Sequence, residues 1–283
     1  MSKNCTYVSG AAFPYQYRYE HMAVTTDCVI FTWEDDTLKV LLIRRGAEPY
    51  KGLWAFPGGF LQMKETAMEG ALRELREETA LEPAAVVELG VFSDVDRDPR
   101  ERVITIAYYA LVKPHAVIGG DDADEAAWFP TDQLPPLAFD HEKIFSAALE
   151  RLRRDIHFEP VGFDLLDEEF SIPDLQRLYE AILGVRFDRR NFQRKILASG
   201  ILEEVSEPAE DARREVDGWP AVRISIGAPM MAAYDMAMDQ EDAPMPDAGV
   251  PSGKRRRGRI ASLFRLNRTR YEQMKEEGGK LEF

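Results

Sequence analysis

Cysteine, long apolar runs and positive charge are all scarce in this sequence. The 283 residues include only two cysteines, Cys5 and Cys28, and no charged-then-apolar leader with a cleavage site is found. Few thiols and no secretory leader indicate a reducing, cytoplasmic compartment rather than a disulfide-stabilised secreted fold. No apolar run reaches the roughly 20 residues that a membrane-spanning helix needs, so we expect no membrane partner.

The excess charge is negative, with a formal net charge of -14. If it were spread evenly it would discourage nucleic-acid binding, so any such function must depend on local basic clusters. Two clusters occur, at residues 189–194 and 254–259. The length and the 45% hydrophobic content suffice for two globular domains, which we predict at residues 1–150, with an N-terminal arm at 1–20, and at 151–283.

The stretch GGFLQMKETAMEGALRELREETAL, residues 58–81, contains a helix with a strong start signal. Thr66 and Glu69 have the spacing of a capping box, which predicts a helix from about Ala67 to near Thr79. At about 100° per residue, four apolar side chains of this helix share a stripe that can pack on a core. These are Met68, Ala71, Leu72 and Leu75.

Three carboxylates, Glu74, Glu77 and Glu78, share a different arc of the same helix. Like charges at this spacing destabilise a helix unless a cation neutralises them. A solvated acidic surface is the ordinary explanation, but carboxylates near Gly58 and Gly59 also suit a hard divalent ion, because glycine lets the backbone approach closely. The pattern is compatible with a phosphate-and-metal site.

The spacing from Gly59 through Glu65 to the run from Arg73 to Leu81 closely resembles the Nudix box of the Nudix hydrolases. That family hydrolyses nucleoside diphosphates linked to another group, using a divalent metal, so the resemblance implies Mg²⁺ or Mn²⁺. It implies that Glu74, Glu77 and Glu78 are catalytic, with Glu74 and Glu78 as the main metal ligands and Glu77 as a ligand or base. It further implies that the Gly58 carbonyl is a metal ligand and that Glu65 and Arg73 form a structural ion pair. Where the family usually has glycine, this chain has Ala80. In a left-handed conformation after the helix this costs about 1 kcal/mol, but no metal ligand is lost.

Strands are predicted on both sides of this helix. Apolar, β-branched runs at Ala23–Glu34 and Thr37–Arg45 form a hairpin-like pair, and residues 86–92 and 103–112 alternate as further strands. A second helix should begin near Asp140, which is a good cap. Strands interleaved with helices predict a mixed-sheet α/β/α sandwich.

Further site candidates lie beyond the box. Arg44 and Arg45 end a predicted strand and either contact a phosphate or form a solvated strand end. Nudix enzymes often take one more acidic ligand from a loop before a tryptophan. The candidates here are Asp122, Asp124 and Glu125, ahead of Trp128.

The C-terminal half contains two closely spaced helices. Ser171 starts the first, which ends at Gly184, and Asp188 caps a second over residues 189–199, as in a helix-turn-helix. On the second helix Phe192, Ile196 and Leu197 can face a core. The outward side chains, which suit base edges and phosphates, are Arg189, Arg190, Gln193 and Arg194.

The segments at 201–205 and 262–266 could pair as strands of a wing whose tip holds Arg255, Arg256 and Arg257. Between them an acidic insertion at about 206–253 is expected to be a largely disordered loop. A final helix is expected near residues 268–277.

The order helix, turn, basic helix, strand, basic loop, strand resembles a winged helix-turn-helix, and FSIPDLQRLYEAILGVRFDRRNFQRKIL carries the likeness. Together with the preceding box it resembles the Nudix-related transcriptional regulators, whose members control NAD or sugar metabolism. The resemblance implies a homodimer that binds double-stranded operator DNA and senses ADP-ribose or a related nucleoside diphosphate-sugar. Three interpretations stay open: a regulator that still hydrolyses its effector, a housekeeping hydrolase whose C-terminal domain only dimerises, and a regulator without catalysis.

Overall fold

The computed structural model describes residues 20–81, 83, 85–114, 123–205 and 262–281. The predictions for the wing-tip arginines, for the insertion and for nearly all of the N-terminal arm concern residues outside these ranges. By its internal contacts the chain divides into two compact units, and every element below belongs to the one made of residues 1–204 and 263–283. No helix of the described ranges is both long and apolar enough to cross a membrane.

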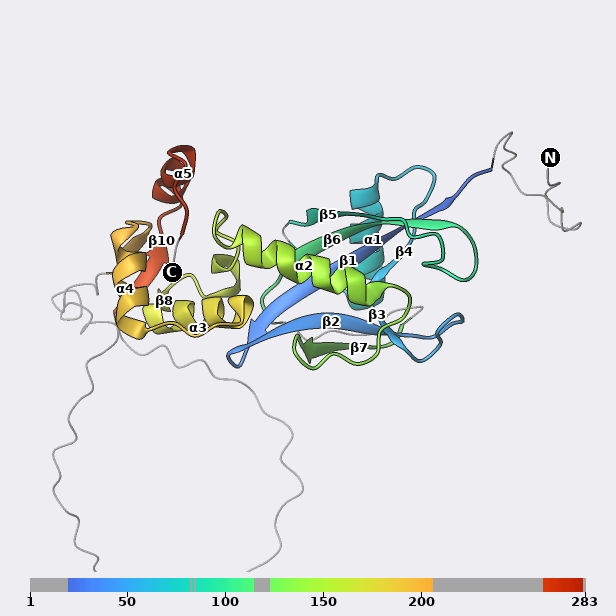
Figure 1. Cartoon of the computed structure of the whole chain (residues 1–283), viewed down its shortest axis with the longest axis horizontal. Coiled ribbons are helices and arrows are strands. Elements are labelled where there is room, and N and C mark those ends of the chain that lie inside the picture. Colours follow the sequence, from blue (N-terminus) through green and yellow to red (C-terminus); the bar gives the residue numbers. More distant parts are fainter. Residues whose placement is uncertain (1–19, 82, 84, 115–122, 206–261, 282–283) are drawn as a thin grey trace, which may run out of the picture. The chain divides into compact units, whose positions relative to one another are not determined.

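A seven-stranded mixed sheet forms the first part of this unit (Figure 1). Its main path runs β3-β2-β1-β6-β5, with β4 paired to β1 and β7 paired to β2. The β1–β6 pair is parallel and the other pairs are antiparallel. The strands are β1 (Ala23–Glu34), β2 (Thr37–Arg45), β3 (Trp54–Ala55), β4 (Gly58–Phe60), β5 (Val87–Phe92), β6 (Val103–Leu111) and β7 (Ala123–Pro130).

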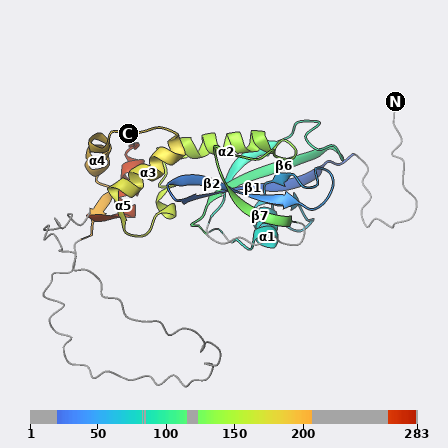
Figure 2. The ribbon, with the colours of Figure 1, turned by 90° about the horizontal axis from the view of Figure 1, so that it is seen from below.

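Helices α1 (Ala67–Thr79) and α2 (His141–Asp155) cover opposite faces of the sheet, as Figure 2 shows. The alternation of side chains along β1 explains this, because successive residues of a strand point to opposite faces. Cys28 and Ile30 pack in a cluster with Ala71 and Leu75 of α1, whereas Val29 and Phe31 belong to the core that contains Ile144 of α2 and its neighbours. The predicted α/β/α sandwich with a mixed sheet is confirmed.

Local signals set the bounds of these elements. Thr66 and Glu69 form both hydrogen bonds of the predicted capping box, and Ala80 ends α1 in the left-handed conformation with φ 59°. The β1–β2 hairpin turns at Asp35 and Asp36, which both have positive φ. The predicted start of α2 is correct, but Asp140 makes no side-chain capping bond, because Arg97 engages its carboxylate.

The second part of the unit is a helical group with a small sheet. Its elements are a 3₁₀ turn at Phe163–Leu165, β8 (Phe170–Ser171), α3 (Ile172–Leu183), α4 (Arg189–Ala198), β9 (Leu202–Glu204), β10 (Leu263–Leu266) and α5 (Arg268–Glu276). Strand β10 pairs antiparallel with β9, as predicted for a wing, and also with β8, which the sequence did not suggest. Ser171 caps α3 with a capping box, and Gly184 ends it.

Two apolar side chains predicted to face the core are exposed instead. Met68 exposes 48% of its surface, because the buried face of α1 is rotated toward Gly70, which Leu61 and Glu65 of the preceding loop cover. Leu197 exposes 41%, since the buried side chains of α4 are Phe192 and Ile196.

Candidate active site and nucleic-acid interface

Helix α1 brings two of the three predicted glutamates to the glycine strand β4. Glu78 is buried, and its Oε2 accepts a hydrogen bond from the Gly58 backbone N–H at 2.8 Å. A Cβ atom on Gly59 would lie 2.4 Å from Glu74 Oε1, and one on Gly58 would lie 2.1 Å from the Thr26 carbonyl oxygen. Both positions therefore need glycine, because a side chain would displace the strand or the carboxylate.

Arg73 connects the loop before α1 to the acidic face of the helix. Its Nε and Nη2 donate to the two carboxylate oxygens of Glu65 at 3.0 and 2.7 Å, and Nη2 also donates to the Phe60 carbonyl. Its Nη1 donates to Glu74 at 2.8 Å and to Glu77 at 3.0 Å. The bond from Arg73 lowers the pKa of Glu65 to about 2.

Glu77 lies apart from the other two glutamates of the box. Its side chain is about half exposed, and it is not among the residues that line the pocket beside Glu74 and Glu78. Positions 74 and 78 are one turn apart, so they lie on one face of the helix, whereas 77 is turned toward Arg73.

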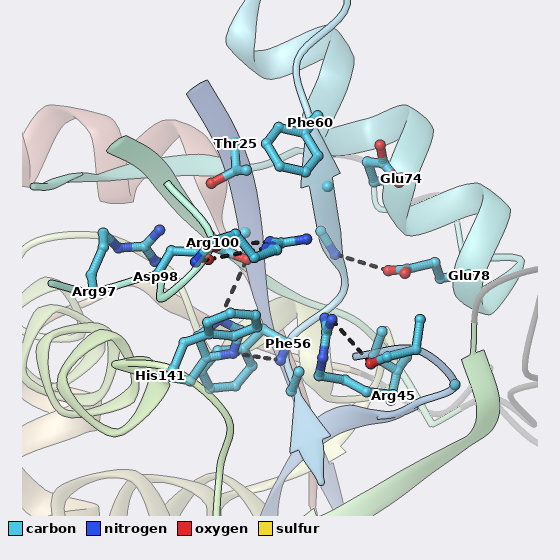
Figure 3. Close-up of a pocket in the computed structure, with 18 of the residues that line it drawn as sticks. Thr25, Arg45, Phe56, Phe60, Glu74, Glu78, Arg97, Asp98, Arg100 and His141 are labelled. Carbon is cyan, nitrogen blue, oxygen red and sulfur yellow. Dashed lines mark hydrogen bonds and ion pairs between the residues drawn. The ribbon is translucent and has the colours of Figure 1, made fainter. Parts of the chain in front are cut away.

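The glutamates line a pocket of about 340 Å³. Figure 3 shows Glu74 and Glu78 on α1 at one side of it, and Arg97, Asp98 and Arg100 at the other. Burial raises the pKa of Glu74, although Arg73 opposes this shift. The pocket thus has an acidic side and a basic side, which is the polarity that a metal-bound phosphate needs.

The basic side is formed by residues from three separate parts of the chain. Arg45 comes from the end of β2, Arg100 from the loop between β5 and β6, and Phe139 from the segment before α2. The guanidinium carbons of Arg45 and Arg100 lie 4.8 and 5.7 Å from the centre of the Phe139 ring. Of these, only Arg45 was predicted. The dense charge of residues 93–102 was the one sequence signal for Arg100.

A buried polar network lies beneath the pocket. His141 Nδ1 accepts a hydrogen bond from the Phe56 N–H at 3.0 Å, so the proton of the neutral ring is on Nε2, 3.7 Å from Asp27 Oδ1. Burial lowers the pKa of His141, which favours this neutral ring. Arg97 donates two hydrogen bonds to the Asp140 carboxylate, and its Nη2 lies 3.7 Å from Asp27 Oδ2. The network holds the N-terminus of α2 against β1 and the 93–102 loop.

Other predicted site residues lie elsewhere. Arg44 is half exposed, donates to the Gly52 carbonyl and lies 3.9 Å from Glu125, and neither residue lines the pocket. Asp124 and Glu125 belong to strand β7, which pairs with β2, so they do not lie in a loop as expected, and a metal-ligand role for them stays a prediction. Asp122 lies outside the described residues.

The side chains at α1 suit an ion such as Mg²⁺ or Mn²⁺, which takes part of its coordination from water and substrate, rather than an ion that is coordinated by protein ligands alone. Within the described residues no group of three or more His, Cys, Asp or Glu side chains could hold an ion. Glu74 and Glu78 nevertheless line the same pocket, next to a backbone that only glycine permits. Mg²⁺ is commonly bound by one or two carboxylates, with waters and substrate phosphates completing its shell, and this arrangement fits that pattern.

The candidate DNA interface is the surface of α4. Asp188 caps the helix, accepting from the Asn191 N–H at 2.8 Å, while Phe192 and Ile196 are buried. All four side chains predicted for DNA contact are exposed: Arg189, Arg190, Gln193 and Arg194. A helix N-terminus with outward arginines presents hydrogen-bond donors, as phosphate and base recognition requires.

Comparison with known proteins assigns the pocket and helix α4 to two known kinds of domain. A NUDIX domain model matches residues 22–148, and a model of the NrtR DNA-binding winged helix domain matches residues 162–217. The chain is 31% identical over 215 residues to the ADPR responsive transcriptional repressor NtrR of Acinetobacter baylyi, which covers 73% of this chain and 86% of that protein. The chain belongs to the Nudix-related transcriptional regulators.

Two further comparisons agree with this membership. An ADP-ribose pyrophosphatase of Methanocaldococcus jannaschii is 48% identical over 130 residues, covering 46% of this chain and 75% of that protein. The crystal structure of Shewanella oneidensis NrtR complexed with a 27mer DNA matches with a TM-score of 0.60 and 27% identity, over 88% of this chain and 95% of that one. This Nudix-related regulator therefore joins a domain of the Nudix hydrolase family, whose members generally use divalent metals, to a winged helix domain.

Proposed function

We propose that this Nudix-related regulator binds ADP-ribose in the pocket beside Glu74 and Glu78, and operator DNA through α4. One observation carries the proposal: a single chain has both a pocket with acidic and basic sides and an exposed arginine-bearing helix. Its similarity to an ADPR responsive repressor supports the choice of ligand. We further propose that the protein acts as a homodimer on a pseudo-palindromic operator.

Binding of the two ligands should be coupled. A ligand shifts an equilibrium only by its different affinity for the two states, typically about 1–3 kcal/mol, so ADP-ribose should lower operator affinity by roughly 5- to 150-fold. The same factor must appear in reverse, with operator DNA weakening ADP-ribose binding. The test is a fluorescence-anisotropy titration of labelled operator, with and without the α,β-methylene analogue of ADP-ribose. Identical operator affinities in the two titrations would contradict the coupling.

Hydrolysis of the bound ADP-ribose to AMP and ribose 5-phosphate is the second part of the proposal. Glu74 and Glu78, with the Gly58 carbonyl, would hold Mg²⁺ or Mn²⁺, whereas Glu77, which lies outside the pocket and is bonded to Arg73, would not contact the ion directly. A divalent ion held there would polarise the pyrophosphate and lower the pKa of the attacking water. Arg73 would keep Glu74 oriented toward the pocket through its 2.8 Å bond. The intact glutamates and the 48% identity to an ADP-ribose pyrophosphatase support retained chemistry.

Turnover and DNA binding separate the alternatives. A protein that hydrolyses ADP-ribose but has no salt-sensitive DNA affinity would be a housekeeping hydrolase. One that binds operator and ADP-ribose without metal-dependent turnover would be a regulator without catalysis. The arginines of α4 favour DNA binding over a purely dimerising role, because positive charge concentrated on one helix face suits the phosphate backbone of DNA.

A further inference from the structure

The loop at residues 93–102 contributes three charged side chains to the pocket that the proposed hydrolysis does not use: Arg97, Asp98 and Arg100. Arg97 and Asp98 are buried, whereas 39% of the Arg100 side chain is exposed. Arg97 is engaged by Asp140 and lies near Asp27, so its charge is compensated inside the protein. Arg100 is the member of the three whose cationic group remains accessible from the pocket.

Asp98 holds Arg100 in one orientation. Its Oδ1 accepts from the backbone N–H of Arg100 at 2.9 Å and from Nε at 3.0 Å, and its Oδ2 accepts from Nη2 at 2.7 Å. The guanidinium carbon lies 5.2 Å from the centre of the Phe60 ring. Within the described part of the chain, no hydrogen bond uses Nη1 of Arg100. Because Asp98 and the Phe60 ring fix the guanidinium of Arg100, its remaining N–H groups are pre-organised to donate to a ligand.

Arg45 approaches the same ring of Phe139 from the end of β2. Its Nε donates to the Pro49 carbonyl at 2.9 Å, and it forms no ion pair with the described carboxylates. Burial lowers the pKa of Arg45, and the like charge of Arg100 lowers it further, while the carboxylates of Glu78, Asp98 and Asp27 oppose the shift. Two cations facing one pocket repel each other, and an anion between them would remove that cost.

We propose that Arg45 and Arg100 form a two-arginine clamp for the pyrophosphate of the ligand, and that Asp98 is the positioning residue for Arg100. This rests on the proposed function, because it assumes that ADP-ribose occupies the pocket. Arg45 and Arg100 line the same pocket as Glu74 and Glu78, so the pyrophosphate would meet the two arginines while its other oxygens face the glutamates. Such a clamp selects a diphosphate over a monophosphate, since each arginine can engage a different phosphate group.

The test uses the full-length protein and calorimetric titration with α,β-methylene ADP-ribose in the presence of Mg²⁺. Arg45→Met and Arg100→Met keep an unbranched apolar stem but remove the guanidinium group and its charge. Each should weaken binding by about 10- to 100-fold, the effect of losing a charge-assisted hydrogen bond. AMP is the second probe. Because it has one phosphate, no more than one of the two substitutions should weaken AMP binding as strongly.

Two control variants carry the same arginine-to-methionine substitution outside the pocket. Arg44→Met alters the neighbouring residue of the same strand, and Arg102→Met alters the same loop, where Arg102 donates to the carbonyls of Ser93 and Asp94. Neither arginine lines the pocket, so both variants should bind the analogue within about 3-fold of wild type. Equal losses in Arg102→Met and Arg100→Met would mean that loop structure, rather than a ligand contact, explains the effect, and would overturn the clamp.

Asp98→Asn tests the positioning role. Alone it should weaken binding of the analogue by about 3- to 10-fold, while in the Arg100→Met background it should cause no further loss, because its effect passes through Arg100. Additive losses would overturn that role. Wild-type affinity in Arg100→Met would overturn the clamp and leave the proposed function standing. A wild-type protein that binds no analogue would remove the proposed function, and the clamp with it.

Discussion

Glu78→Gln is the most informative single change, because the structure distinguishes Glu78 from its neighbour Glu77. Glu78 is buried, lines the pocket and accepts from the Gly58 N–H at 2.8 Å, whereas Glu77 is about half exposed and bonded to Arg73. Glutamine has the size of glutamate and keeps an oxygen for the Gly58 N–H. It lacks the charge that a divalent ion requires.

The effects on stability and on catalysis should differ in size. Replacing a charge-assisted hydrogen bond by a neutral one should cost about 1 kcal/mol of unfolding free energy, partly offset because a buried charge is removed. Loss of a metal ligand should remove about 3–5 kcal/mol of transition-state stabilisation, so turnover of ADP-ribose should fall by about 10²- to 10⁴-fold. The variant should therefore be folded but nearly inactive.

The assay measures release of AMP from ADP-ribose with Mg²⁺ or Mn²⁺, alongside urea unfolding of each protein. Glu77→Gln is the matched control, and from its place outside the pocket we expect a loss below about 10-fold. If Glu78→Gln turned over like wild type, or if Glu77→Gln were the more damaging change, the assignment of ligands from the pocket would be refuted. Turnover that is absent from wild type would instead favour a regulator without catalysis.

Three further outcomes are expected. Ala80→Gly should raise the unfolding free energy by about 1 kcal/mol in urea titration, because residue 80 is left-handed with φ 59°; a loss of stability would contradict this. Burial opposes ionisation of Glu180, but bonds from Gln176, the Phe187 N–H and Arg186 lower its pKa below the ordinary value of 4.5. The ionised form therefore stabilises the fold above about pH 4.5 and this contribution is lost as the pH falls further, so Glu180→Gln should be less stable than wild type by about 1–2 kcal/mol at pH 7, with the gap closing in acid. A gap that does not change with pH would argue against that pKa. Arg190→Ala should weaken operator binding and reduce the slope of log affinity against log salt by about one unit if it contacts a phosphate, whereas an unchanged slope and affinity would exclude that contact.

Elements with local signals were predictable from the sequence almost residue by residue. The capping boxes at Thr66 and Ser171 mark the starts of α1 and α3, and Gly184 marks an end. These signals work at short range, because a cap satisfies donors only a few residues away. The β1–β2 hairpin was predictable for a similar reason, since alternation and a two-residue turn are local properties. The pairing of β8 with β10 carried no local signal, and only the tertiary structure revealed it.

The basic side of the pocket had no such signal. Arg45, Arg100 and Phe139 meet only because the strand order brings the end of β2, the β5–β6 loop and the start of α2 to one place. Arg44 and Arg45 were equivalent in sequence, and the direction of each side chain at the strand end separated them. Asp27 was a sequence signal for the buried network that was not used, because a carboxylate inside an apolar strand must be paired when it is buried.

The three glutamates of α1 show most clearly what the sequence determines and what it does not. Spacing alone established that Glu74, Glu77 and Glu78 belong to one helix with a Nudix box, and helical periodicity put them on a shared arc. Which of them line the pocket depended on the rotation of α1 about its axis. That rotation is set by the packing of Ala71 and Leu75 against the sheet and by the loop covering Gly70. Since these contacts join residues far apart in the chain, the tertiary structure alone decided that Glu74 and Glu78 enter the pocket while Glu77 stays outside.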